Sequence, residues 1–177
     1  MNRQNQPGTA HVLLIYTGGT IGMIENPETG RLQAFEFAFL EEHLPELKRL
    51  SFEVECIQFN PPIDSSDITV AHWLDLAQII LSKRDQYDGF VVLHGTDTMS
   101  YTASALSFLL KGLLKPVVLT GSQLPIGRLR TDGKENLITA LQIAAAQDDK
   151  GQAMVPEVCI YFNANLMRGN RTTKISA

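Results

Sequence analysis

The chain of 177 residues contains only two cysteines, Cys56 and Cys159, and both lie inside runs of strand-like residues. This excludes a disulfide-rich scaffold and favours free thiols buried in a reducing compartment. No stretch approaches the roughly 20 apolar residues that a transmembrane helix needs. The first ten residues are polar and lack the apolar segment of a secretory signal peptide. We therefore expect a cytoplasmic protein without a membrane partner.

Blocks of lysine and arginine are also missing. The chain has 15 Lys and Arg against 19 Asp and Glu, which gives a net charge of -4. A negative chain without a basic patch has little electrostatic basis for binding nucleic acid, so no such partner is expected. Apolar residues make up 44% of the chain, which is typical of a globular protein. The length suffices for one domain with a hydrophobic core.

Five short segments are strand candidates, and four longer stretches are helix candidates. The predicted strands are residues 12–16, 52–59, 90–93, 116–120 and 157–162. The predicted helices are residues 35–50, 69–82, 98–113 and 131–147. Because strands and helices alternate, we expect an α/β fold with a mainly parallel sheet flanked by helices on both faces.

Two of these helices carry apolar stripes that we expect to face the core. The stripe in 98–113 consists of Tyr101, Ala105, Phe108 and Leu109, and that in 69–82 consists of Trp73, Leu74, Ala77, Ile80 and Leu81.

Three segments have the composition of loops. Residues 17–34 contain Pro27 and Gly30 and are expected to form a mobile loop of the kind that covers active sites. Residues 121–130 form a second long loop at a strand end. Residues 163–177 follow the last predicted strand, and they are either a loose end or an incomplete part of something longer.

The most informative motif, Thr17-Gly18-Gly19-Thr20-Ile21, directly follows the first predicted strand. Its glycines allow the backbone to turn tightly at the carboxyl end of the strand, where open α/β sheets bind ligands. A second cluster, His94-Gly95-Thr96-Asp97-Thr98, follows the third predicted strand. Two such strand ends suggest one active site built on hydroxyl groups.

Thr20 has a functional and a structural interpretation. A threonine hydroxyl becomes a nucleophile when a base or a hydrogen-bond network activates it, and a glycine turn can direct N–H groups at a substrate oxygen. The alternative is a tight turn in which Thr20 bonds only to local backbone. Nucleotide binding is disfavoured, because Gly22-Met23 does not match a phosphate-binding loop and Gln58-Phe59-Asn60 offers no acid for a dinucleotide.

The second cluster is equally open to two interpretations. Asp97 or Thr98 could simply cap the helix that starts near Met99. A carboxylate beside a threonine could also hold a substrate ammonium or orient a lysine. His94 is another titratable candidate, although a histidine in this position is more typical of a packed structural residue.

Two further groups of residues depend on the fold for their meaning. Asp64-Ser65-Ser66-Asp67 precedes the predicted helix at 69–82. Capping that helix explains one of these residues, and the short hydroxyl donors suit an anion such as an amino-acid carboxylate. Lys174 becomes informative if the fold returns it to Thr96. There a buried lysine could act as the base for a hydroxyl, with Asp97 beside it.

With these motifs the chain resembles the N-terminal domain of an L-asparaginase, specifically of the cytoplasmic type I bacterial group. The matching segments, in the order of the family, are residues 16–23, 64–67, 87–90, 94–99, 101–108, 120–123 and 168–174.

The resemblance implies hydrolysis of L-asparagine to L-aspartate and ammonia without cofactor or metal. Thr20 would be the nucleophile that forms the acyl-enzyme. Thr96, Asp97 and Lys174 would form a second catalytic group, in which Thr96 positions or activates water and Lys174 supplies the base.

The resemblance also implies how the substrate is held. Its α-groups would be bound by Asp64, Ser65 and Ser66, helped by Thr96 and Asp97. The family further implies a homo-oligomer, a dimer or tetramer, in the full-length form.

Two departures from the family pattern bear on these expectations. Many members carry a tyrosine in the lid loop that assists the nucleophile, but residues 25–35 contain none, and Arg31 lies near the expected place. The family has a second α/β domain after a linker. We therefore expect residues 1–177 to form the N-terminal catalytic domain, with the C-terminal domain absent.

Two other functions are compatible with the same motifs. One is a weakly active or inactive domain that binds an amino acid. The other is a related amidase such as a glutamyl-tRNA amidotransferase subunit, whose tRNA partner would favour a more basic surface than this chain has.

Overall fold

The computed structural model describes residues 9–25, 29–30, 32–34 and 44–175. In this part of the chain, six strands form one sheet in the order β4-β1-β5-β6-β7-β8. The first five are parallel, and β8 is antiparallel to β7. The strands are β1 (His11–Tyr16), β4 (Glu53–Gln58), β5 (Gly89–Leu93), β6 (Val117–Thr120), β7 (Val158–Phe162) and β8 (Asn165–Arg168).

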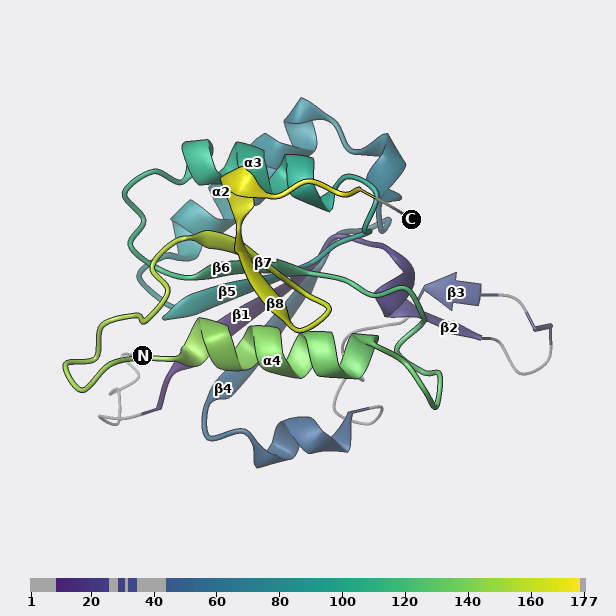
Figure 1. Cartoon of the computed structure of the whole chain (residues 1–177), viewed down its shortest axis with the longest axis horizontal. Helices are drawn as coiled ribbons and strands as arrows, with labels where there is room; N and C mark the ends of the chain where they lie inside the picture. The colour runs from purple at the N-terminus through teal and green to yellow at the C-terminus, as the bar shows by residue number, and fades with distance from the viewer. Residues whose placement is uncertain (1–8, 26–28, 31, 35–43, 176–177) are drawn as a thin grey trace.

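Helices cover both faces of this sheet. Figure 1 shows α2 (Val70–Lys83) and α3 (Met99–Leu109) above it and α4 (Gly133–Ala145) below it. The interior strand β1 is buried on both faces: Leu13 and Ile15 pack toward α2 and α3, and Leu14 and Tyr16 pack toward α4. A strand buried on both faces has no polar face, which is why it reads as a continuous apolar run. The predicted α/β architecture is confirmed.

The five predicted strands agree with the structure to within one residue at each end, and three predicted helices correspond to α2, α3 and α4. The fourth predicted helix, at 35–50, is wrong where the structure describes it. Residues Pro45–Arg49 form a short 3-10 helix, η3, with Pro45 at its start. A proline lacks the N–H that a helix interior needs, so an α-helix cannot run through this position. Residues 35–43 lie outside the described residues.

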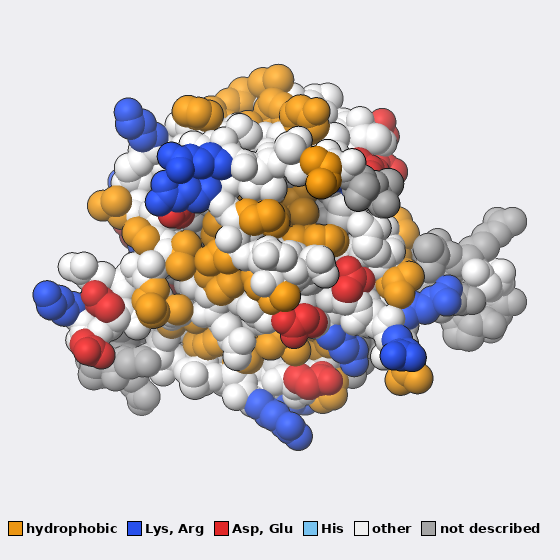
Figure 2. Space-filling model, viewed as in Figure 1, with side chains coloured by type: hydrophobic (Ala, Val, Ile, Leu, Met, Phe, Trp, Pro, Cys, Tyr) orange, Lys and Arg blue, Asp and Glu red, His pale blue; other side chains and the backbone are white. Residues whose placement is uncertain are grey.

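The predicted core stripe of α3 is also wrong. Tyr101 and Phe108 are 65% and 71% exposed, and Leu109 is exposed as well. The buried face carries Met99, Thr102, Ala103 and Leu106 instead. On α2 the prediction holds in part: Ala77 and Ile80 are buried, but Leu74 and Leu81 are exposed and Trp73 is half-buried. Figure 2 shows apolar side chains exposed at the top, over these helices, and others scattered across the middle of the same face.

The segment predicted as a mobile loop contains regular structure. The 3-10 helix η1 (Thr20–Gly22) leads into β2 (Met23–Glu25), which pairs antiparallel with β3 (Leu32–Ala34). Residues 26–28 and Arg31 lie outside the described residues. The prediction of a loop is therefore wrong at Met23–Glu25 and Leu32–Ala34, which form strands.

The segment after β7 is not a loose end. Asn163 and Ala164 adopt positive φ values of 49° and 59°, and Phe162 pairs with Asn165 across them. Two consecutive residues in this conformation make the tight turn that joins antiparallel strands. The chain continues through β8 into a 3-10 helix, η5 (Gly169–Arg171), which packs on α3. At Gly169 an added Cβ would lie 3.0 Å from the Ala103 carbonyl oxygen.

The connection through α4 differs from the other two. The connections β4-α2-β5, β5-α3-β6 and β6-α4-β7 all run in the same direction across parallel strands. Because α4 lies on the opposite face from α2 and α3, its crossover has the opposite hand, although such crossovers nearly always share one hand. The loop between β6 and α4 therefore leads from the carboxyl end of β6 to the face opposite α2 and α3.

Both cysteines are free thiols, as predicted. Cys159 is buried and Cys56 is partly buried, and burial raises the pKa of each thiol to about 12. Within the described part of the chain, no helix has both the length and the apolar character needed to cross a membrane.

Candidate active site at the carboxyl edge of the sheet

Three segments meet at the carboxyl ends of β1, β4 and β5, and glycines bring them into backbone contact. At Gly18 an added Cβ would lie 1.9 Å from the Ile63 carbonyl oxygen, and at Gly19 it would lie 2.6 Å from the Gly95 Cα. At Gly95 it would lie 2.4 Å from the Ser65 Oγ. No side chain fits at these places, so the sequence must have glycine for the three predicted site segments to come together.

Gly19 offers a direct test of this packing. Gly19 and Gly112 both have positive φ, 93° and 87°, but a Cβ on Gly112 would meet no atom within 4 Å. Gly112→Ala should cost about 1 kcal/mol of stability through backbone strain alone. Gly19→Ala should cost a further 1–3 kcal/mol or so, because backbone atoms of Gly95 must move and because Gly19, with φ 93° and ψ 170°, lies in a region that essentially only glycine adopts. Urea unfolding of both variants measures the difference, and equal losses would contradict close packing at Gly19.

Thr20 begins η1 directly after this contact, and its side chain is half-buried. The segment is tied to the neighbouring strand by Thr17, whose backbone N–H and hydroxyl both donate to the Leu93 carbonyl oxygen, at 3.0 and 2.9 Å. The Thr17 carbonyl in turn accepts from the Ile63 N–H at 2.7 Å. Thr20 thus stands on a turn that is fixed on both sides.

Asp64, Ser65 and Ser66 form a separate turn rather than the cap of α2. Asp64 precedes the 3-10 helix η4 (Ser65–Asp67) and accepts from the Ser66 N–H at 2.9 Å and from its hydroxyl at 2.8 Å. These hydrogen bonds lower the pKa of the exposed Asp64 carboxyl, which favours the charged carboxylate. The capping position of α2 is Thr69, whose N–H donates to His72 Nδ1.

The second cluster is joined to this turn. Thr98 occupies the N-cap position of α3, but its hydroxyl donates to the Ser65 carbonyl oxygen at 2.6 Å instead of capping the helix. Ser65 itself is buried, whereas Asp64 and Ser66 are exposed. The interpretation of Thr98 as a side-chain cap is therefore wrong, and its hydroxyl connects two of the predicted site segments.

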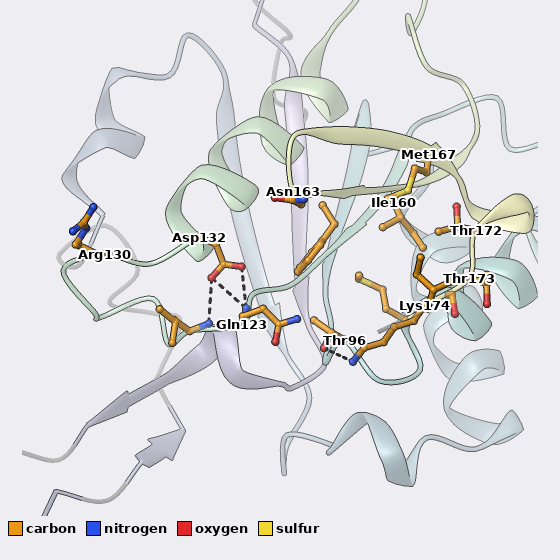
Figure 3. A pocket seen from close by; sticks show the side chains of 15 residues that line it. Thr96, Gln123, Arg130, Asp132, Ile160, Asn163, Met167, Thr172, Thr173 and Lys174 are labelled. Carbon is orange, nitrogen blue, oxygen red and sulfur yellow. Dashed lines mark hydrogen bonds between the residues drawn. The ribbon is translucent and has the colours of Figure 1, made fainter. Parts of the chain in front are cut away.

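The fold does return Lys174 to Thr96. Figure 3 shows the Lys174 ammonium beside the Thr96 hydroxyl, and Lys174 Nζ donates to Thr96 Oγ1 at 3.1 Å and to Asp97 Oδ1 at 2.8 Å. The Lys174 side chain is mostly buried, and the Asp97 side chain is mostly exposed. A hydroxyl, a carboxylate and an amine that are 77 and 78 positions apart in the chain thus form one cluster.

His94 is a buried, neutral link in a hydrogen-bond chain. Its Nδ1 lies 2.7 Å from the Gly95 carbonyl oxygen, which can only accept, so Nδ1 carries the proton. Its Nε2 therefore accepts from the Thr102 hydroxyl at 2.8 Å, and Thr102 accepts from Trp73 Nε1 at 2.9 Å. Burial lowers the pKa of His94 to about 4, which agrees with a neutral ring.

This histidine should make the folded state sensitive to acid. Its pKa is about 4 in the folded chain and about 6.5 when unfolded. Between these values the unfolded chain binds more protons, so stability is complete above pH 6.5 and falls as the pH falls toward 4. The loss between pH 7.5 and pH 5 should be about 2 kcal/mol. Urea unfolding at the two pH values should show this loss of unfolding free energy in the wild type and in the control variant His72→Gln. An equal pH dependence in His94→Gln would contradict the assignment.

A cavity of about 790 Å³ adjoins the Lys174 cluster. Figure 3 shows Thr96 and Lys174 on one side of it and the loop between β6 and α4 on the other. That loop is held by Asp132, whose carboxylate accepts from the N–H groups of Gln123 and Leu124. The remaining wall includes Ile160, Phe162, Met167, Thr172 and Thr173. The described side chains that line it do not include Thr20 or the turn at 64–66.

Two residues that line this cavity, Gln123 and Asp132, are not predicted by the sequence. Gln123 follows β6 and Asp132 directly precedes α4, and the sequence pattern assigns neither residue a place in the site. The position of Gln123 at a strand end was the one available signal. Nothing in the sequence indicates that Asp132 reaches back to hold it.

Comparison with known proteins identifies the relatives of this chain. The family described as "Asparaginase, N-terminal" matches residues 11–177. L-asparaginase 1 of Escherichia coli K12 is 46% identical over 171 residues, which cover 94% of this chain and 48% of that protein. A 60 kDa lysophospholipase of Homo sapiens is 45% identical over 190 residues, which cover 94% and 32%.

The structural comparison agrees. The crystal structure of L-asparaginase I from Vibrio cholerae is similar with a TM-score of 0.84 and 43% identity, covering 96% of this chain and 49% of that one. The chain thus spans about half the length of these two bacterial L-asparaginases. Its fold and site define an α/β domain of the asparaginase type. The chain belongs to the asparaginase family and corresponds to the N-terminal domain of that family.

Proposed function

We propose that this chain carries the catalytic half of an L-asparaginase, which hydrolyses L-asparagine to L-aspartate and ammonia through an acyl-enzyme on Thr20. The observation that carries the proposal is the contact of Lys174 with Thr96 and Asp97. Lysine, threonine and aspartate converge there at the same edge of the sheet that bears Thr20. Membership of the asparaginase family supports hydrolysis of asparagine as the reaction.

The reaction has two steps. The Thr20 hydroxyl oxygen attacks the carbon of the side-chain amide, the hydroxyl proton passes to the departing nitrogen, and ammonia leaves. Water then attacks the resulting ester, the bond between carbon and Thr20 oxygen breaks, and a proton returns to Thr20. Each step passes through an oxyanion, which N–H donors of a glycine-rich turn can stabilise.

The Lys174 cluster supports a role in moving the proton. As an ammonium, Lys174 donates to Thr96. As a neutral amine it would accept from the Thr96 hydroxyl, and the hydrogen bond would reverse. Thr96 would then be able to take a proton from water or to orient it, while Asp97 holds the amine in place.

The turn at 64–66 is suited to the substrate's α-groups. Asp64 presents a carboxylate for an α-ammonium, and the exposed Ser66 hydroxyl lies beside it. Ser65 is buried, so we expect it to contribute through its position against Gly95 and Thr98 more than through an open hydroxyl. Thr96 and Asp97 would complete this part of the pocket.

The test is ammonia release from L-asparagine with hydroxylamine present. Hydroxylamine competes with water for an acyl-enzyme and gives the β-hydroxamate of aspartate. We expect ammonia at an unchanged yield per turnover, with part of the aspartate replaced by hydroxamate. Ammonia release without any hydroxamate would contradict the acyl-enzyme, and no release at all would contradict the proposed activity of this chain.

The alternative of an amino-acid-binding domain is distinguished in the same samples. Aspartate or asparagine would then raise the unfolding temperature without ammonia release.

Self-association and a cytoplasmic location remain predictions. The exposed side chains of Tyr101, Phe108 and Leu109 support the former, because a patch of this kind on a helix face commonly marks a contact surface.

A further inference from the structure

Tyr16, the last residue of β1, lies beneath the turn that carries Thr20. Its side chain is fully buried and packs in the cluster on the α4 side of the sheet. Its hydroxyl lies 3.3 Å from the carbonyl oxygen of Gly19 and 3.3 Å from that of Gly22. These two carbonyls flank η1, so a single hydroxyl proton is shared between the residue before Thr20 and the last residue of its turn.

The ring of Tyr16 and Gly22 fit each other closely. An added Cβ at Gly22 would lie 2.2 Å from Tyr16 Cζ and 2.4 Å from the hydroxyl oxygen. The ring therefore occupies the space that any other residue at position 22 would need. The turn has two hydrogen bonds of its own, from Gly22 N–H to Gly19 and from Met23 N–H to Thr20, and the Ile126 N–H donates to the Ile21 carbonyl oxygen from outside at 3.3 Å. The Tyr16 hydroxyl adds a second outside hold, at the two ends of η1.

The phenol is suited to this task across the working pH range. Burial raises the pKa of Tyr16 to about 12, so the hydroxyl keeps its proton and remains a donor. A nucleophile must also be held closely, since a displacement of about 1 Å costs on the order of 10²-fold in rate.

We propose that Tyr16 is a positioning residue that holds the Thr20 turn through its hydroxyl and its fit against Gly22. The proposal rests on the proposed function of Thr20 as nucleophile. Tyr16 acts through the backbone of Gly19 and Gly22, and no role at the reacting atoms is assigned to it.

The test compares Tyr16→Phe with Tyr161→Phe. Tyr161 is a buried tyrosine of the same cluster, and its hydroxyl donates to Glu135 at 2.9 Å, away from the Thr20 turn. Tyr16→Phe should lower kcat for ammonia release at least tenfold with KM within twofold of the wild type. Tyr161→Phe should leave both within twofold, at a similar loss of unfolding temperature.

Hydrogen exchange provides a second measurement that does not depend on activity. The amide of Gly22 should exchange at least tenfold faster in Tyr16→Phe than in Tyr161→Phe. Should Tyr16→Phe fail to fold, Gly22→Ala displaces the ring while keeping the hydroxyl, and the same changes are expected.

The outcomes separate the two proposals. A kcat for Tyr16→Phe within twofold of the control would overturn the clamp. If the wild-type chain releases no ammonia, the proposed function fails, and exchange alone decides on the clamp. Unchanged exchange at Gly22 would then overturn it, and faster exchange would support it.

Discussion

Replacing Thr20 with alanine is expected to lower kcat for ammonia release by about 10⁴-fold or more, as loss of a covalent nucleophile does elsewhere. The reason is that no acyl-enzyme can form without the hydroxyl, and water must then attack the amide directly. We expect the Thr20→Ala variant to fold, because Thr20 is half-buried and the alanine removes atoms without adding any. Aspartate should still raise its unfolding temperature, which shows that the binding groups remain in place.

Two controls make this result specific. Thr20→Ser keeps a hydroxyl and should retain far more activity than Thr20→Ala. Thr139→Ala removes a hydroxyl on α4 that donates to Glu135, and it should leave kcat unchanged. If Thr20→Ala kept more than one hundredth of the wild-type kcat, Thr20 would not be the nucleophile.

Replacing Lys174 with methionine should lower kcat by about 10²–10⁴-fold, the usual contribution of a positioned acid or base. The methionine has a similar length but cannot donate to Thr96 or Asp97. Because the aspartate would lose its cation, a modest loss of stability is expected beside the kinetic effect. Steady-state kinetics of ammonia release measure the first, and urea unfolding measures the second.

The arginine variant separates the two roles that Lys174 could have. Lys174→Arg keeps a positive charge near Asp97, but a guanidinium does not give up its proton near neutral pH. A base role predicts that Lys174→Arg is nearly as slow as Lys174→Met. Recovery of most of the activity in Lys174→Arg would show that charge alone suffices. Lys134→Met, which removes only a surface pair with Glu46 at 3.8 Å, should leave kcat unchanged.

Four of the five parallel strands, β1, β5, β6 and β7, were predictable because burial removes polar residues from them. Residues 12–16 are all fully buried, and this produces an apolar run that periodicity and length identify. The buried face of α3 was not predictable for the related reason. None of its eleven residues is charged, so apolar residues such as Phe108 also stand on the exposed face and the pattern does not favour either side.

The hairpin of β7 and β8 was missed because its turn lacks the usual signal. Positive φ at two consecutive positions normally appears in a sequence as Asn-Gly or Gly-Gly. Here Asn163 is followed by Ala164, so the sequence does not reveal the reversal. With this hairpin undetected, the path by which Lys174 reaches Thr96 could not be derived from the sequence either.

The candidate site was also predictable only in part. Thr20 and Thr96 could be placed at strand ends because each directly follows an apolar run. The distances between loops could not be predicted, because they depend on which glycines face another backbone. Gly19 faces the backbone of Gly95 and Gly112 faces open space, and no local pattern separates the two.

The way in which Lys174 reaches Thr96 also sets the order in which the site can form. Thr96 and Asp97 are made 77 residues or more before the amine that pairs with them. Contacts between distant parts of a chain form late, because a long loop must close first. During synthesis the sheet from β4 to β6 can assemble while Asp97 still lacks this cation. The cluster is completed only when η5 docks on α3, so an obstruction at Gly169 would delay or prevent the pairing of Lys174 with Thr96 and Asp97 in a chain whose core has already folded.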